Sequence, residues 1–134
     1  MARYKKGDTR KALRNVITRC WGVKKDKCFI TGKSNDLTVH HCGLSFNEIF
    51  IMAHEDLGIS FKKNKYDYSM EEYIALKYTV LGYHYMYAEP ITLTREIHQE
   101  LHNRYGETPT KDDLMALKKE YESRTNNNNV EEIA

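Results

Sequence analysis

Two pairs of histidines stand out in this chain. His40 and His41 end a short strand-like run, whereas His98 and His102 lie four residues apart in a run with helical periodicity. Residues at positions i and i+4 lie on one face of a helix, so His98 and His102 can present two nitrogens to one metal ion. The His40–His41 pair offers candidates for a third ligand and for a base. This composition is typical of a metal site that does chemistry.

A divalent ion held by three imidazoles keeps open coordination positions. There it can bind an oxygen atom of a substrate and stabilise the negative charge that develops on a leaving oxygen. A neutral imidazole, with an ordinary pKa of about 6.5, can take a proton from the attacking water near neutral pH. The expected cofactor is one divalent ion, Mg, Mn, Ni or Zn, and imidazole ligands suit the last three better than Mg.

Three segments in this order resemble the HNH endonucleases, also called His-Me finger or ββα-metal nucleases, and in particular the small HNH proteins of bacteriophages. They are CFITGK at 28–33, LTVHH at 37–41 and ITLTREIHQELHNRYG at 91–106. The resemblance rests on both halves of the motif occurring in this order. It implies metal-dependent hydrolysis of DNA to a 5′ phosphate and a 3′ hydroxyl, by a homing or nicking endonuclease.

The resemblance also implies a role for each of the four histidines. His40, His98 and His102 would bind the metal, and His41 would be the general base. Adjacent residues of a flat strand point to opposite faces, so strand geometry leaves the ligand and base labels of His40 and His41 interchangeable. Only the resemblance orders them.

The chain departs from the family pattern at two places. The position of the family's central Asn falls near Glu89 when it is counted back from His98. The three cysteines, Cys20, Cys28 and Cys42, form no C-x-x-C pair, so we expect reduced thiols and no structural zinc. The replaced Asn supports an alternative function, a catalytically weak or inactive HNH-fold module that binds DNA with a partner.

The helical histidines also match part of the metalloprotease pattern H-E-x-x-H. That pattern requires Glu directly after the first histidine, but here Gln99 follows His98 and Glu100 comes one place too late. A metalloprotease is therefore excluded.

The chain has 134 residues, 40% of them hydrophobic, which is enough for one modest core. We expect a single nuclease domain over residues 1–125 and a disordered tail over 126–134, which begins with four Asn. The sequence contains no stretch that fits a membrane span or a signal peptide. A cytoplasmic protein is expected, in the host cytoplasm if a phage encodes it.

Basic residues crowd the first part of the chain, although the formal net charge is only +2. Lysine and arginine neutralise phosphates and release counterions, so this part predicts binding to double-stranded DNA. A solvated helix surface explains the same charges equally well. The expected DNA-binding residues are Lys5, Lys6, Arg10, Arg14, Lys24 and Lys25.

The pattern of residues predicts an α+β fold with a ββα-metal core, a short β-hairpin and a metal-bearing helix, surrounded by further helices. Strands are expected at 28–30 and 37–41, with a short extended piece at 91–93. The metal-bearing helix should begin after Thr94 and end at Gly106. Other helices are expected at about 8–21, at about 45–58 after a capping box, and at about 110–124.

A tyrosine-rich helix is expected at about 69–87, again after a capping box. The resemblance implies that this helix is an insertion in the nuclease core. Apolar residues follow two neighbouring stripes of this helix, so its apolar surface needs cover on two sides. Internal core is the first interpretation of this surface. The others are an interface between two copies of the chain and a platform for stacking bases.

Overall fold

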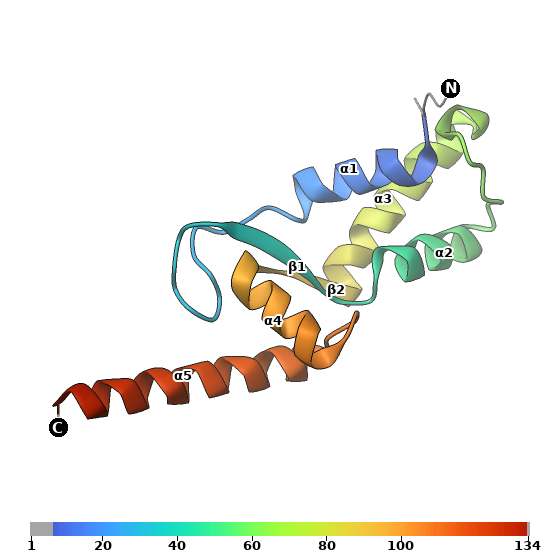
Figure 1. The fold of residues 1–134 in the computed structure, drawn as a ribbon. Coiled ribbons are helices and arrows are strands. Elements are labelled where there is room, and N and C mark those ends of the chain that lie inside the picture. Colours follow the sequence, from blue (N-terminus) through green and yellow to red (C-terminus); the bar gives the residue numbers. More distant parts are fainter. Residues whose placement is uncertain (1–6, 134) are drawn as a thin grey trace. The chain divides into compact units, whose positions relative to one another are not determined.

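The computed structural model describes residues 7–133, with the backbone alone for 126–133. Within this range the protein is an α+β structure with five α-helices and one two-stranded antiparallel sheet (Figure 1). The elements in chain order are α1 (Thr9–Cys20), β1 (Leu37–Gly43), α2 (Phe46–Leu57), the 3₁₀ helix η1 (Lys65–Asp67), α3 (Met70–Tyr87), β2 (Ala88–Thr94), α4 (Arg95–Tyr105) and α5 (Lys111–Ile133).

The domain predicted for residues 1–125 comprises two compact units. The first, which we call the helical unit, contains Met1–Val23 and Leu44–Glu89 and so holds α1, α2 and α3. The second, which we call the sheet unit, contains Lys24–Gly43 and Pro90–Ala134 and so holds β1, most of β2, α4 and α5. The predicted insertion at 69–87 is therefore α3, one helix of a unit that also includes α1 and α2.

Local signals start and end the helices of the helical unit as the sequence predicted. Ser45 and Ser69 each accept a hydrogen bond from the backbone N–H of the glutamate three residues on, and that glutamate accepts one from the serine N–H. Gly58 ends α2 in the left-handed conformation, with φ 65°. The core of this unit draws side chains from all three helices, among them Leu13, Ile17, Ile49, Phe50, Leu76 and Val80.

The tyrosine-rich helix α3 is core on one side and exposed on another. Leu76, Val80 and His84 are buried, which confirms the internal-core interpretation for this stripe. A second stripe stays uncovered within the described residues. It consists of Met70, Ile74, Tyr78 and Tyr85, which are 46% to 78% exposed.

The prediction of a strand at 28–30 as one half of the hairpin is wrong. Residues 28–30 form a turn, and β1 pairs instead with β2, which extends beyond the short piece expected at 91–93. The turn closes on itself because the N–H of Cys28 donates to the carbonyl of Lys33. Among the described residues, its backbone contact with a strand is the hydrogen bond from Phe29 N–H to the carbonyl of Thr92, at 2.8 Å. One hydrogen bond does not make a ladder, so the segment adds no third strand.

The register of the sheet is fixed by backbone hydrogen bonds at its two ends. These are Arg95 N–H to the Asp36 carbonyl, 3.0 Å, and Leu44 N–H to the Tyr87 carbonyl, 3.1 Å. The antiparallel register that satisfies both places His40 opposite Ile91 and His41 opposite Pro90. In this register the nitrogen of Pro90 points away from β1, so its missing N–H costs no ladder bond.

The last two helices belong to the sheet unit. Thr94 caps α4 by accepting from Ile97 N–H at 3.2 Å, and the helix ends at Gly106, both as predicted. The prediction for α5 is wrong at its end, because the helix continues to Ile133 and includes most of the expected disordered tail, 126–134. Asparagine lowers helix propensity by less than about 0.7 kcal/mol per residue, and neither Gly nor Pro interrupts the segment. Ala134 lies outside the described residues.

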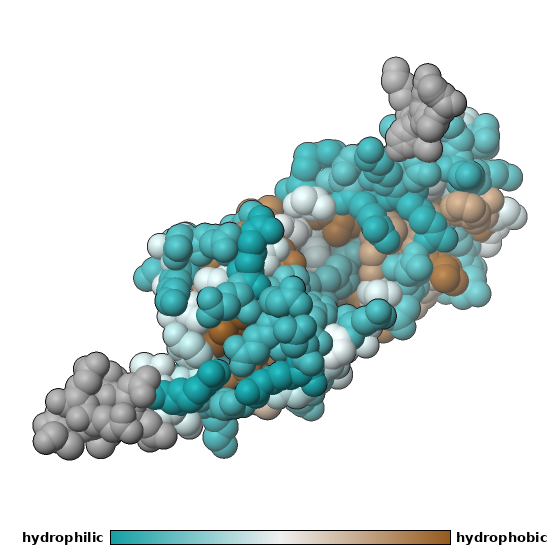
Figure 2. Space-filling view, viewed as in Figure 1, coloured by the Kyte–Doolittle hydropathy of each residue, from teal (hydrophilic) through white to brown (hydrophobic). Residues whose placement is uncertain are grey.

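The molecular face in Figure 2 is mostly hydrophilic, and hydrophobic residues appear on it in small, separate areas. Among the described residues, no helix combines the length and the apolar character needed to cross a membrane. The apolar side chains of the sheet unit instead form a second core, which contains Cys28, Ile30, Cys42, Ile91, Leu93, Ile97, Leu101, Leu114 and Leu117.

Candidate metal centre

His40 of β1 and the two histidines of α4 lie together in the sheet unit. Nδ1 of His40 is 3.3 Å from Nε2 of His98, and Nε2 of His98 is 3.1 Å from Nε2 of His102. One ligand atom from each residue lies within 4.8 Å of the others. Tetrahedral coordination with bonds of about 2.0 to 2.1 Å spaces ligand nitrogens about 3.3 Å apart. These three histidines, which we call the histidine cluster, are therefore close enough to bind one metal ion.

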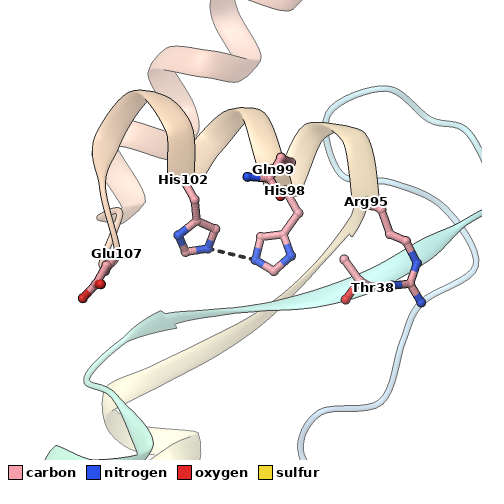
Figure 3. Close-up of a pocket in the computed structure, with 6 residues that line it drawn as sticks. All are labelled: Thr38, Arg95, His98, Gln99, His102 and Glu107. Atoms are coloured by element: carbon pink, nitrogen blue, oxygen red, sulfur yellow. Dashed lines mark hydrogen bonds between the residues drawn. The ribbon is translucent and has the colours of Figure 1, made fainter.

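The backbone explains why these side chains meet. His98 and His102 lie one turn apart on α4, so their rings stand next to each other above the sheet (Figure 3). Side chains of a strand alternate between its faces, and along the end of β1 His40 and Cys42 are the buried residues. Because α4 packs against β1, the face that carries His40 is the one that reaches the helix.

The end of α4 orients His102. Its Nδ1 donates a hydrogen bond to the carbonyl of Gly106 at 2.9 Å, since a carbonyl can only accept. In the neutral ring this leaves the lone pair on Nε2, the nitrogen next to His98. Gly106 has φ 90°, a conformation that favours glycine. The residue that ends the helix therefore also selects the tautomer that can bind a metal.

The donor set fits a cation better than it fits protons. The Nε2 lone pair of His102 and the facing nitrogen of His40 both lie next to Nε2 of His98. A proton on Nε2 of His98 can be donated in a hydrogen bond to only one of these two nitrogens. A single cation can accept lone pairs from all three nitrogens. The cluster therefore has the chemistry of a metal site.

Burial lowers the pKa of two of the cluster histidines, His40 and His98. It is the largest cause that lowers the pKa of His40 to about 4, and the neighbouring histidines His98, His102 and His41 lower it further, while the carbonyl of Pro109 acts against them. Burial, followed by His102, also lowers the pKa of His98. Both rings are therefore neutral at pH 7, which is the form that binds metal.

We expect the metal-free protein to lose stability as the pH falls from about 6.5 to about 4. The pKa of His40 is about 4 in the folded protein against 6.5 for an ordinary histidine. Between about pH 6.5 and pH 4, His40 is protonated in the unfolded chain but neutral in the folded protein. The free energy of unfolding therefore decreases as the pH falls. The contribution of His40 is complete above about pH 6.5, and its slope is at most about 1.4 kcal/mol per pH unit.

Urea unfolding of the metal-free protein at several pH values measures this effect. His40→Gln removes the titrating ring and should flatten the dependence in this window. Equal pH slopes for the parent and the variant would contradict the assignment.

An open pocket lies beside the histidine cluster. In Figure 3, His98 and His102 stand in the middle of a row of side chains that has Arg95 at one end and Glu107 at the other. Two of the three cluster histidines line this pocket, so a substrate in it would lie next to an ion bound at the cluster. The lining residues are Thr38 of β1, Arg95, His98, Gln99 and His102 of α4, and Glu107 from the loop that follows.

Sequence reasoning missed the lining residues other than the histidines. Helical periodicity could have found two of them, because Arg95 and Gln99 share a face of α4 with His98 and His102. Thr38 lies two residues before His40 on β1, so it shares the face of that ligand. Nothing in the sequence places Glu107.

His41 lies outside both the cluster and the pocket lining. Its two ring nitrogens are buried. The packing of β1 therefore decides which member of the His40–His41 pair joins His98 and His102, and His40 is the one that the resemblance implied. The role of His41 as general base stays a prediction. Glu89, the position expected for the family's Asn, is an exposed residue at the start of β2.

Two of the predicted DNA-binding residues contact aromatic rings of α2. The guanidinium of Arg10 lies 4.5 Å from the ring centre of Phe50, and that of Arg14 lies 4.8 Å from Phe46. These cation–π contacts help to pack α1 on α2, so packing accounts for part of the basic character of this helix. Of the other predicted residues, Lys24 and Lys25 are exposed, and Lys5 and Lys6 lie outside the described residues.

No family model, no curated protein and no solved structure matches the chain.

Proposed function

We propose that this protein is a metal-dependent DNA endonuclease of the HNH type. One observation carries the proposal. Three imidazole nitrogens from a strand and a helix are spaced for a single ion, and two of them line an open pocket. When bound there, a divalent ion supplies a Lewis acid for a phosphate oxygen and for the charge on the leaving oxygen.

The open side of the cluster favours a catalytic metal over a structural one. Structural zinc sites are closed by four protein ligands, whereas catalytic sites have three and keep a position for water or substrate. Among the described residues, the group that can hold an ion contains three histidines. The fourth position is therefore left for water or a phosphate.

In this proposal His41 accepts a proton from the attacking water, the role that the resemblance implies. An imidazole is the commonest group for this task. The ring nitrogens of His41 are buried, and strand alternation places His41 on the face opposite His40. In this proposal β1 must therefore twist or break at His41 when substrate binds. Catalytic contacts often form only in the complex with substrate, so a buried His41 is compatible with this role.

We propose a second copy of the chain as a partner, with α3 as the interface. The exposed apolar stripe of α3, Met70, Ile74, Tyr78 and Tyr85, supports this proposal. Two active sites in one dimer can cut both strands of a duplex, whereas a monomer with one site nicks it.

Conversion of supercoiled plasmid in the presence of Mg, Mn, Ni or Zn tests the function. We expect metal-dependent nicking or linearisation that EDTA abolishes. No conversion with any of the four metals, at a protein concentration that shifts the same DNA in a gel, would instead support the alternative, an HNH-fold module that binds DNA without cutting it.

A further inference from the structure

Arg95 lies on the same face of α4 as two of the cluster histidines. It lines the pocket with His98 and His102, and Figure 3 shows its side chain at the end of the pocket opposite Glu107. A helix rises 1.5 Å per residue, so the backbone of Arg95 lies about 4.5 Å along the axis from that of His98. The long arginine side chain therefore samples the space next to any group held at the cluster.

The present partner of Arg95 is Asp36. Nε of Arg95 lies 3.0 Å from Oδ1 of Asp36, and the two side chains are 69% and 62% exposed. Ion pairs this exposed contribute little to stability, so a stronger anion can displace the carboxylate. The pair joins Nε to one carboxylate oxygen, and a guanidinium has further N–H donors in a fork that matches a phosphate.

Asp36 is held in place independently of this ion pair. Its carbonyl accepts the backbone N–H of Arg95 at 3.0 Å, which ties it to the start of α4. Its φ of 56° lies in the left-handed region, which Asp and Asn tolerate better than most residues. The backbone of Asp36 is therefore fixed at the start of α4, and its carboxylate holds the guanidinium at the edge of the pocket.

We propose that Arg95 binds the backbone phosphate next to the one held at the histidine cluster, and that Asp36 holds its guanidinium in position until DNA displaces the carboxylate. The inference rests on the proposed function and names how its substrate is bound. At the other end of the pocket Glu107 repels phosphate, so the DNA strand continues from the cluster on the side of Arg95.

The salt dependence of DNA binding tests this subsite without any cleavage. Affinity for a short duplex is measured in EDTA over a range of NaCl concentrations. Each phosphate contact contributes about 0.9 to the slope of log K against log salt, so Arg95→Gln should reduce the magnitude of the slope by about 0.9. Lys119→Gln is the matched control, since it removes one exposed positive charge of α5 outside the pocket lining.

Asp36→Asn gives a change in the opposite direction. Asn keeps the backbone carbonyl that accepts from the N–H of Arg95, and it tolerates the positive φ. It lacks the carboxylate that competes with phosphate for the guanidinium. We expect this variant to bind the duplex more tightly than the parent. Binding that is unchanged or weakened would count against the exchange of Asp36 for phosphate.

The outcomes separate this inference from the proposed function. If the slope for Arg95→Gln equals that of the parent while the parent cuts plasmid, the phosphate subsite is wrong and the nuclease stands. If the parent neither binds the duplex nor cuts plasmid, both are wrong. A reduced slope for Arg95→Gln, with the parent slope kept by Lys119→Gln, supports a phosphate contact at Arg95, and plasmid cleavage by the parent tests the proposed function separately.

Discussion

His98→Ala should lose metal binding and, with it, DNA cleavage. Nε2 of His98 lies between the other two ligands, 3.3 Å from Nδ1 of His40 and 3.1 Å from Nε2 of His102. Its removal leaves two imidazoles, which is too few for a site that needs three protein ligands. Loss of a partner that merely orients a ligand costs 10- to 100-fold in affinity, so loss of the ligand itself should cost more than about 100-fold.

Calorimetric titration with Zn or Ni measures the affinity, and the plasmid assay measures the activity. Asn103→Ala is a matched control, because Asn103 is exposed on the same helix and follows His102 directly. It should bind metal like the parent. Circular dichroism shows whether each variant keeps its helices. A folded His98→Ala protein with the metal affinity of the parent would overturn the histidine cluster as the metal site.

His41→Ala should reduce cleavage by about 10²- to 10⁴-fold while metal and DNA binding stay close to those of the parent. The factor is what a positioned general base typically contributes. Metal binding should survive because the ligand atoms come from His40, His98 and His102. The pH dependence of cleavage at saturating metal is a second readout, since the variant should lose the limb that reports the base.

The paired variant His40→Ala separates the two adjacent histidines. With the roles as proposed, His40→Ala loses metal binding and His41→Ala keeps it. The reverse result would exchange the ligand and base labels. Full cleavage by His41→Ala would show that another group activates the water.

Local hydrogen bonds explain why so many helix ends were predictable from the sequence. The capping boxes at Ser45 and Ser69, the cap at Thr94 and the stop at Gly106 each involve residues within a few positions of one another. The same short range makes the pair His98 and His102 readable, because helix geometry alone brings residues four apart together. At the end of α5 the four Asn from 126 are a weaker stop signal than Gly106, and the helix continues through them to Ile133.

Strand pairing depends on distant parts of the chain, and the prediction of which segment pairs with β1 was wrong. The sequence predicts the apolar run at 28–30 as the partner of β1, but β2, which includes Pro90, takes that place. A two-stranded sheet has two free edges, so a proline whose nitrogen points outward is tolerated. Which of two candidate segments pairs with β1 is decided by packing over more than forty residues of intervening chain, and no local pattern records it.

Residue types and spacing by themselves determined that His98 and His102 share a helix face and that a strand ending in two histidines could complete a metal site. Only the tertiary structure decided that His40 is the residue that joins them, because that choice depends on which face of β1 is covered by α4. It also decided that Arg95 and Glu107 lie at opposite ends of the pocket. The alternation of a strand offers two faces equally, and only the packing of a helix on one of them makes the two histidines different.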